Sequence, residues 1–145
     1  MKHQGAKFEH EDERNDELMT AYHGLMEKAD YVSMPDIYQR VAELPSSRFW
    51  VSEERAAIVI SSMMRGDKLE NMHPNKREMF YEIYRRCMLL KEQFPNLSPY
   101  ELCFRVIRQP APKFYLTPGY VKVIICKAKQ KWYEKRKQKL RHLLW

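Results

Sequence analysis

Hydrophobic residues in the first part of the chain recur at helical spacing. Between about 12 and 29, positions three and four apart are apolar: Leu18, Tyr22, Leu25, Met26 and Ala29. Acidic residues gather just before this stripe, where they favour a helix N-terminus. The pattern predicts an amphipathic helix over about 12–29, and the polar, glycine-containing residues 1–10 are expected to form a disordered tail.

The next two predicted helices have clear start and stop signals. Ser33 begins a Ser-x-x-Asp sequence that resembles a capping box, and Pro45 ends the helix that follows. The sequence SSRFWV after it is typical of extended chain. Ser52 then predicts the cap of a third helix, which is apolar on nearly all sides from Ala56 and stops at Gly66.

The second half has the same order of signals after a predicted linker at 66–74. A helix is expected from Asn75 and Glu78 to Pro95, with a stripe at Phe80, Ile83, Tyr84, Cys87, Leu90 and Phe94. Ser98 and Glu101 form a capping box for a fifth helix, in which we expect Leu102, Val106 and Ile107 to be buried. Thr117 and Pro118 predict a sixth helix that continues through Trp132 towards residue 140.

One stretch of sequence occurs twice. Residues 33–61 and 98–126 align without a gap at an offset of 65, and the pairs include Ser33/Ser98, Ile37/Leu102, Arg40/Arg105, Val41/Val106, Pro45/Pro110, Phe49/Phe114, Ser52/Thr117 and Ile60/Ile125. Such a repeat predicts an all-α fold of two tandem three-helix units packed with pseudo-two-fold symmetry. The predicted boundaries are 11–72 for the first repeat and 73–145 for the second, and the two are expected to form one compact unit because about 65 residues are marginal alone.

The repeat is similar to a helix-turn-helix, whose last helix lies in the DNA major groove. The connections LPSSRFWV and QPAPKFYL are, however, longer than the usual three or four residues and contain no glycine. The alternative is a plain helical repeat in which Phe49 and Phe114 fill a shared core.

Charge is distributed unevenly over the 145 residues. Residues 1–72 hold 9 Lys and Arg against 14 Asp and Glu, which is −5, and residues 73–145 hold 17 against 5, which is +12. The stretch 127–145 alone has eight basic residues and one acid, Glu134. This asymmetry favours a polyanionic partner, most often nucleic acid. No apolar run reaches the ~20 residues of a membrane span, and residues 1–16 do not resemble a secretory signal, so a cytoplasmic protein is expected.

The candidate nucleic-acid contacts lie mainly in the second repeat. Gly119 gives the sixth helix a small, uncharged N-terminus that suits an anion, and the basic side chains beyond it are expected to contact phosphate: Lys122, Lys127, Lys129, Lys131, Lys135 and Arg136. Arg48 beside Trp50 and Lys113 beside Tyr115 occupy equivalent places in the two connections. If the connection is extended, these pairs face outward and could bind phosphate and stack on a base. The alternative is an internal cation–π contact.

Signals for catalysis are weak. The five histidines are scattered, the four glycines form no phosphate-binding loop, and no Ser or Cys stands in a known nucleophile motif. The cysteines Cys87, Cys103 and Cys126 have no metal-ligand spacing and are expected to be buried free thiols. We therefore expect neither enzymatic activity nor a cofactor or metal.

The sequences PSSRFWVSEERA and PAPKFYLTPGYVKVI resemble segments of small uncharacterised helical proteins from gut bacteria and their phages. The resemblance spans nearly the whole chain and implies a DNA-binding protein of a mobile element. The function expected is non-enzymatic binding of nucleic acid, in particular duplex DNA, through the sixth helix and the basic C-terminal segment. The alternative is a protein-interaction or phage assembly component, in which the basic tail binds an acidic partner and Leu140, Leu143, Leu144 and Trp145 anchor in a groove or on a membrane surface.

Overall fold

A computed structural model describes residues 10–28 and 34–144, and these contain six helices and no strand. The helices are α1 (Glu11–Lys28), α2 (Met34–Glu43), α3 (Glu53–Met64), α4 (Pro74–Gln93), α5 (Pro99–Val106) and α6 (Pro118–Leu144). The predicted all-α class is confirmed. Residues 1–9 of the predicted tail and the Ser33 cap lie outside the described residues.

Most of the predicted helix ends are confirmed by their caps. Ser52 accepts a hydrogen bond from the Arg55 N–H at 3.2 Å, and Ser98 accepts one from the Glu101 N–H at 3.2 Å. Gly66 has a φ of +104°, the left-handed conformation that suits a residue after a helix. The start of α4 is corrected: Pro74 is its first residue and the His73 ring, rather than Asn75, caps it. Proline fits there because the first helical N–H has no partner within the helix.

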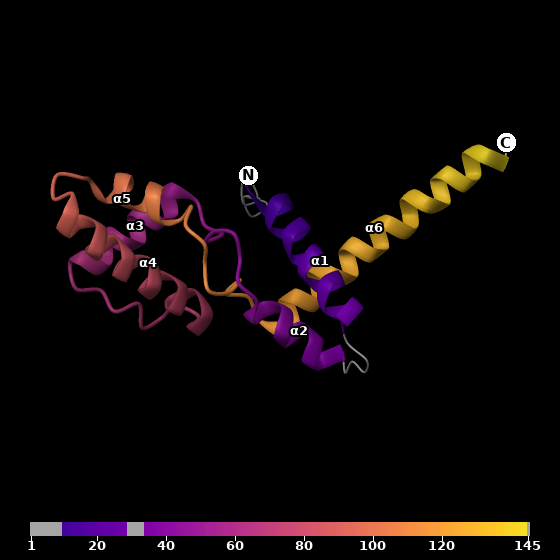
Figure 1. Cartoon of the computed structure of the whole chain (residues 1–145), viewed down its shortest axis with the longest axis horizontal. Helices are drawn as coiled ribbons and strands as arrows, with labels where there is room; N and C mark the ends of the chain where they lie inside the picture. Colours follow the sequence, from indigo (N-terminus) through magenta and orange to yellow (C-terminus); the bar gives the residue numbers. More distant parts are fainter. Residues whose placement is uncertain (1–9, 29–33, 145) are drawn as a thin grey trace. The chain divides into compact units, whose positions relative to one another are not determined.

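The chain divides into two compact units, each assembled from both halves of the sequence (Figure 1). Unit 1 comprises residues 1–14 and 43–115 and contains α3, α4 and α5. Unit 2 comprises residues 15–42 and 116–145 and contains most of α1, α2 and α6. The units therefore do not coincide with the segments 11–72 and 73–145, and the stretch 66–74 lies inside unit 1. Leu69 in that stretch is only 7% exposed.

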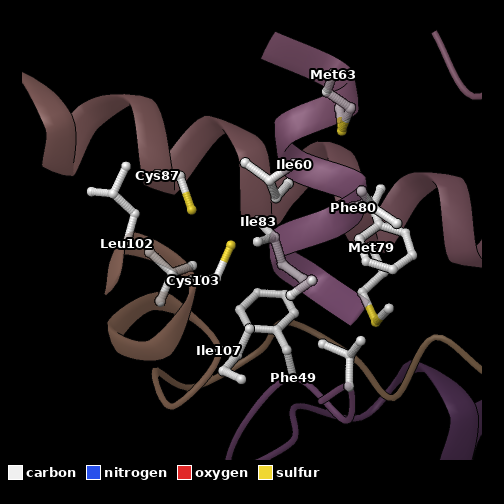
Figure 2. Packing of buried hydrophobic residues seen from close by; sticks show 14 of the residues in the cluster. Phe49, Ile60, Met63, Met79, Phe80, Ile83, Cys87, Leu102, Cys103 and Ile107 are labelled. Carbon is white, nitrogen blue, oxygen red and sulfur yellow. The ribbon is translucent and has the colours of Figure 1, made fainter. Parts of the chain in front are cut away.

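Unit 1 has a core in which α3, α4 and α5 all pack against one another. Phe49, from the connection before α3, is fully buried beside Ile83 and Ile107 (Figure 2). Its N–H donates to the Ile107 carbonyl at 2.9 Å, and the Arg86 guanidinium lies 4.9 Å from its ring centroid. The expected burial of Leu102, Val106 and Ile107 is confirmed.

The two connections meet in unit 1 at an antiparallel bridge between Ser46 and Ala111. Each N–H donates to the other residue's carbonyl, at 3.0 and 2.9 Å. This pairing satisfies backbone groups of two buried, non-helical residues, which would otherwise be left without partners.

Two of the three cysteines are buried as expected. Cys87 on α4 and Cys103 on α5 are fully buried, and their sulfur atoms point toward each other (Figure 2). Cys126 on α6 is exposed, so its predicted burial is wrong. It lies one residue beyond the buried pair Ile124 and Ile125, on the side of the helix that faces solvent.

Unit 2 takes its buried residues from all three of its helices. They are Leu18 and Tyr22 on α1, Ile37, Tyr38, Val41 and Ala42 on α2, and Val121, Ile124 and Ile125 on α6. On α6 the buried positions end at Ile125, and Ala128 is half-buried. The unit therefore uses only the first part of a 27-residue helix for its core.

Candidate nucleic-acid interface

The N-terminus of α6 is capped and open. Thr117 Oγ1 accepts a hydrogen bond from the Tyr120 N–H at 3.1 Å, as its position before Pro118 predicts. Gly119 is exposed, and nothing lies within 4 Å of the place where a Cβ would stand. The space directly beside Gly119 in the first turn of α6 is therefore open to a ligand.

Beyond its core residues, α6 is basic and exposed. Every residue from 129 to 144 is exposed, and the whole helix has nine Lys and Arg residues with Glu134 as its one acid. At about 100° per residue these cations lie on all sides of the helix rather than along one stripe. Lys122, Lys127, Lys131 and Lys135 are exposed and have no carboxylate within ion-pair distance among the described residues. Their charges are available to an anionic partner.

Two of the expected phosphate contacts also interact within unit 2. Lys129 donates to the Tyr22 hydroxyl at 2.9 Å, and its ammonium lies 4.9 Å from the centroid of that ring. The hydrogen bond with Tyr22 raises the pKa of Lys129, against the opposing effect of burial. Arg136 lies 5.3 Å from the Trp132 ring centroid. Lys129 keeps two further N–H donors, so it can hold an anion without leaving Tyr22.

A cavity of about 480 Å³ lies beside Lys129, between α1 and α6 of unit 2. Its lining residues are Met19, His23, Ala128, Lys129, Trp132 and Tyr133. The Trp132 and Tyr133 rings meet edge to face at 5.1 Å and are 55% and 59% exposed. An exposed aromatic pair with cations on both sides combines stacking surface and charge.

The expected contacts from the two connections lie in unit 1 and have internal partners. Arg48 donates to the carbonyls of Phe49 and Val51 at 3.1 and 3.4 Å, and lies 5.4 Å from the Trp50 ring. Lys113 forms an ion pair with Glu78 at 2.7 Å and lies 5.6 Å from the Tyr115 ring. These contacts confirm the alternative, an internal cation–π pair, in both connections.

The predicted outward orientation of Tyr115 is wrong. Tyr115 is 7% exposed and stacks on Phe49 with centroids 6.1 Å apart. Its φ is +58°, so the chain is not extended there and the alternation of sides is lost. Burial, followed by the charges of Glu82 and Glu78, raises the pKa of Tyr115 to about 12.

The sequence interpretation did not identify the aromatic cavity. Val121, Ile125, Ala128 and Trp132 continue one helical stripe at spacings of four, three and four residues. That stripe carries the apolar face of α6 past the core and onto Trp132. The continuation of this stripe is the one feature of the sequence that points to the cavity. Met19 and His23 lie on α1, more than 100 residues earlier, and only the fold brings them to α6.

The part of the chain that the structure describes has no helix long and apolar enough to cross a membrane. Among the same residues, no cluster of three or more His, Cys, Asp or Glu side chains could hold a metal ion. Comparison of the chain with protein-family models, curated proteins and solved structures finds no match.

Proposed function

We propose that this protein is a non-enzymatic nucleic-acid-binding protein that contacts duplex DNA through α6 and the basic C-terminal segment. The observation that carries the proposal is the exposed stretch 129–144, which has seven Lys and Arg residues and one acid. Cations that complement the helix dipole are needed only in the last turn, and these cover more than four turns. Their number and spread fit release of counterions from a phosphate backbone.

The dimensions of α6 support contact with the major groove. An α-helix with side chains is about 10–12 Å across, and the groove is about 12 Å wide. A helix in the groove has a phosphate backbone on each side, so cations on all sides of α6 match it better than a single stripe would. At 1.5 Å per residue the stretch 129–144 is about 24 Å long, roughly seven base pairs.

We further propose that the chain is a tandem three-helix repeat with pseudo-two-fold symmetry, in which the two repeats exchange their third helices. Matching burial at an offset of 65 supports this. Paired positions are all at most 5% exposed: Leu18/Ile83, Tyr22/Cys87, Ile37/Leu102, Val41/Val106, Phe49/Phe114, Ala56/Val121, Val59/Ile124 and Ile60/Ile125. The first three-helix segment contributes α3 to unit 1, and the second contributes α6 to unit 2.

The bridge between the connections supports the same proposal. Ser46 and Ala111 are themselves 65 apart, and they exchange hydrogen bonds reciprocally. A two-fold relation between two copies places equivalent residues opposite each other in this way. The caps also correspond, since Ser52 accepts from Arg55 and Thr117 accepts from Tyr120.

The experiment measures the affinity for random duplex DNA over a range of salt concentrations. Replacing Lys127, Lys129, Lys131 and Lys135 with Gln is expected to weaken binding at least tenfold at low salt. It should also reduce the slope of log affinity against log salt by about 3–4, near one for each phosphate that the variant no longer neutralises.

The matched control changes the same number of exposed cations in unit 1, at Arg55, Arg65, Lys68 and Lys76. This control should retain most of the affinity. Equal losses in both variants would show that only net charge matters, and absence of binding at low salt would overturn the proposal.

The exposed leucines favour a second candidate function, an interaction or phage assembly protein with an acidic protein partner. Leu140, Leu143 and Leu144 are 50%, 82% and 80% exposed and lie among the basic residues at the end of α6. A basic amphipathic helix of this kind can dock in an acidic groove. Purification with a stoichiometric acidic protein and without nucleic-acid absorbance would favour this function over DNA binding.

The setting we propose is the cytoplasm of a bacterium that carries a mobile element. The resemblance of the repeated phrase to proteins of gut bacteria and phages suggests the element. The free thiols Cys87, Cys103 and Cys126 fit a reducing compartment.

A further inference from the structure

The cavity between α1 and α6 has the size and lining of a small-ligand site. Its volume of about 480 Å³ lies within the ~300–1,000 Å³ typical of ligand pockets. Trp132 and Tyr133 supply aromatic surface, and Met19 and Ala128 supply apolar surface. Lys129 supplies a charge that its hydrogen bond to Tyr22 fixes in place.

In unit 1, positions that correspond to part of this lining are packed against the core, whereas Asp67 and Lys68, the counterparts of Trp132 and Tyr133, line a separate cavity of about 780 Å³. At an offset of 65, the lining residues Met19, His23 and Lys129 correspond to Tyr84, Met88 and Met64. All three of those are partly buried hydrophobic residues that pack against the unit 1 core. In unit 2 the same positions hold smaller or polar side chains and line an open cavity. The cavity is therefore a feature of unit 2 rather than a consequence of three-helix packing.

Charge complementarity, together with the aromatic lining, favours a nucleotide as the occupant. The basic stretch of α6 continues directly from the cavity through Lys131, Lys135 and Arg136. An apolar protein side chain would gain nothing from these cations, whereas a nucleotide has both a flat apolar base and an anionic phosphate. The base would stack on Trp132 while Lys129, with two remaining donors, contacts a base oxygen or the adjoining phosphate.

We infer that this cavity binds an unpaired nucleobase and thereby makes single-stranded nucleic acid a ligand of the basic helix. The inference rests on the proposed function, because the same lysines must hold the phosphate backbone. A paired base is unavailable to the cavity, since both its faces are stacked within the duplex. The cavity therefore adds affinity for single strands and none for duplex DNA.

The test uses the full chain with a labelled oligothymidine and a labelled random duplex of equal length, measured by fluorescence anisotropy. Trp132→Ala is expected to weaken single-strand binding by about 5- to 150-fold, the range for loss of one stacked base. Duplex affinity should change less than about twofold. Tyr100→Ala is the matched control, because it removes a 45% exposed aromatic side chain from α5 of unit 1, which has no part in the cavity lining, and it should change neither affinity.

A second readout does not depend on loss of the side chain. Oligothymidine should quench the fluorescence of the wild-type protein, and Trp132→Phe should remove the part of that quenching that comes from Trp132, leaving only what Trp50 and Trp145 contribute. The phenylalanine ring should retain most of the single-strand affinity. Duplex binding together with unchanged single-strand affinity in Trp132→Ala overturns the inference alone. Equal losses on both ligands also overturn it, and absence of binding to either ligand overturns the proposed function with it.

Discussion

Units 1 and 2 each contain three helices, but α3 in unit 1 and α6 in unit 2, which correspond at the offset of 65, differ in length. In unit 1, α3 has 12 residues and stops at Met64, and the chain then turns through Gly66 into a loop held by hydrogen bonds. Asp67 accepts from the Ser62 hydroxyl and the Leu69 N–H at 2.8 and 2.9 Å, and Tyr81 donates to the Lys68 carbonyl at 2.6 Å. In unit 2, α6 continues past the core to Leu144.

The two units also differ in what lies beside the C-terminal end of the core part of these helices. After α3, unit 1 has a loop with a buried residue, Leu69, and methionine and tyrosine side chains pack on its core. In unit 2, the cavity lined in part by Lys129 and Trp132 lies at this level of α6, and the helix continues beyond it as a basic segment. We infer that unit 1 supplies mainly stability and that unit 2 supplies the surface for a partner.

Phe49→Ala should have the largest effect on stability, because Phe49 is fully buried in unit 1 under Arg86 and against Tyr115. Loss of such a ring leaves a cavity and is expected to cost about 3–5 kcal/mol in the free energy of unfolding. Denaturant unfolding measures the loss. Ile58→Ala is the control, since Ile58 on α3 is 63% exposed and should change stability by less than about 0.5 kcal/mol.

Hydrogen exchange on the Phe49→Ala protein tests whether the units are independent. If they are, protection should fall in α3, α4 and α5 and persist in α2 and the first turns of α6. A uniform fall over all helices would show that the two units unfold together.

Glu53→Gln should have an intermediate effect, because Glu53 at the start of α3 is 8% exposed and forms an ion pair with Arg108. Its counterpart in unit 2 is Pro118, so α6 begins without this carboxylate. Hydrogen bonds to charged groups contribute about 1.5–3 kcal/mol, and Arg108 is partly exposed, so we expect a loss of about 1–2 kcal/mol at neutral pH.

The pH dependence follows from the direction of the Glu53 pKa. Its own backbone N–H, and then Arg108, lower the pKa below the ordinary 4.5, against the opposing effect of burial. A lowered folded-state pKa stabilises the protein above the unfolded-state value, and this contribution is lost as pH falls through the folded-state pKa. The stability difference between wild type and Glu53→Gln should therefore be full near neutral pH and shrink below about pH 4.5. A difference independent of pH would assign the effect to packing.

Local signals in the sequence predicted the helices well and the assembly poorly. Ser52, Ser98 and Thr117 mark helix starts because a cap depends on residues within one turn. The division into units depends instead on where the chain passes from one unit to the other, after Ala42 and after Tyr115, and no local pattern encodes that. The repeat at an offset of 65 could not show whether α3 packs with its own preceding helices or with α4 and α5.

The candidate interface also has features that local sequence predicts and features that depend on the fold. The basic, exposed character of α6 could be predicted because charge density over many turns requires solvent or an anionic partner. The orientation of Tyr115 could not, because its φ of +58° reverses the side chain relative to an extended strand and buries it on Phe49. The aromatic cavity joins residues of α1 and α6, so it also requires the fold.

Lys129→Met should have the smallest effect on stability. It makes unit 2 more like unit 1 at this position, because Met64 is the corresponding residue of unit 1. The change removes the hydrogen bond and the cation–π contact to Tyr22, each of which contributes about 0.5–1 kcal/mol at a partly exposed site. The methionine side chain should recover part of this by packing over the cavity, as Met64 packs on unit 1. We therefore expect a net change within about 1 kcal/mol in the free energy of unfolding, measured in denaturant, with single-strand affinity reduced.

Lys127→Met is the control for this prediction, because Lys127 is exposed and outside the cavity lining, and its replacement removes the same charge. If the two variants reduced single-strand affinity equally, Lys129 would act only as one more cation, and the difference between the ends of the two units would have no part in binding.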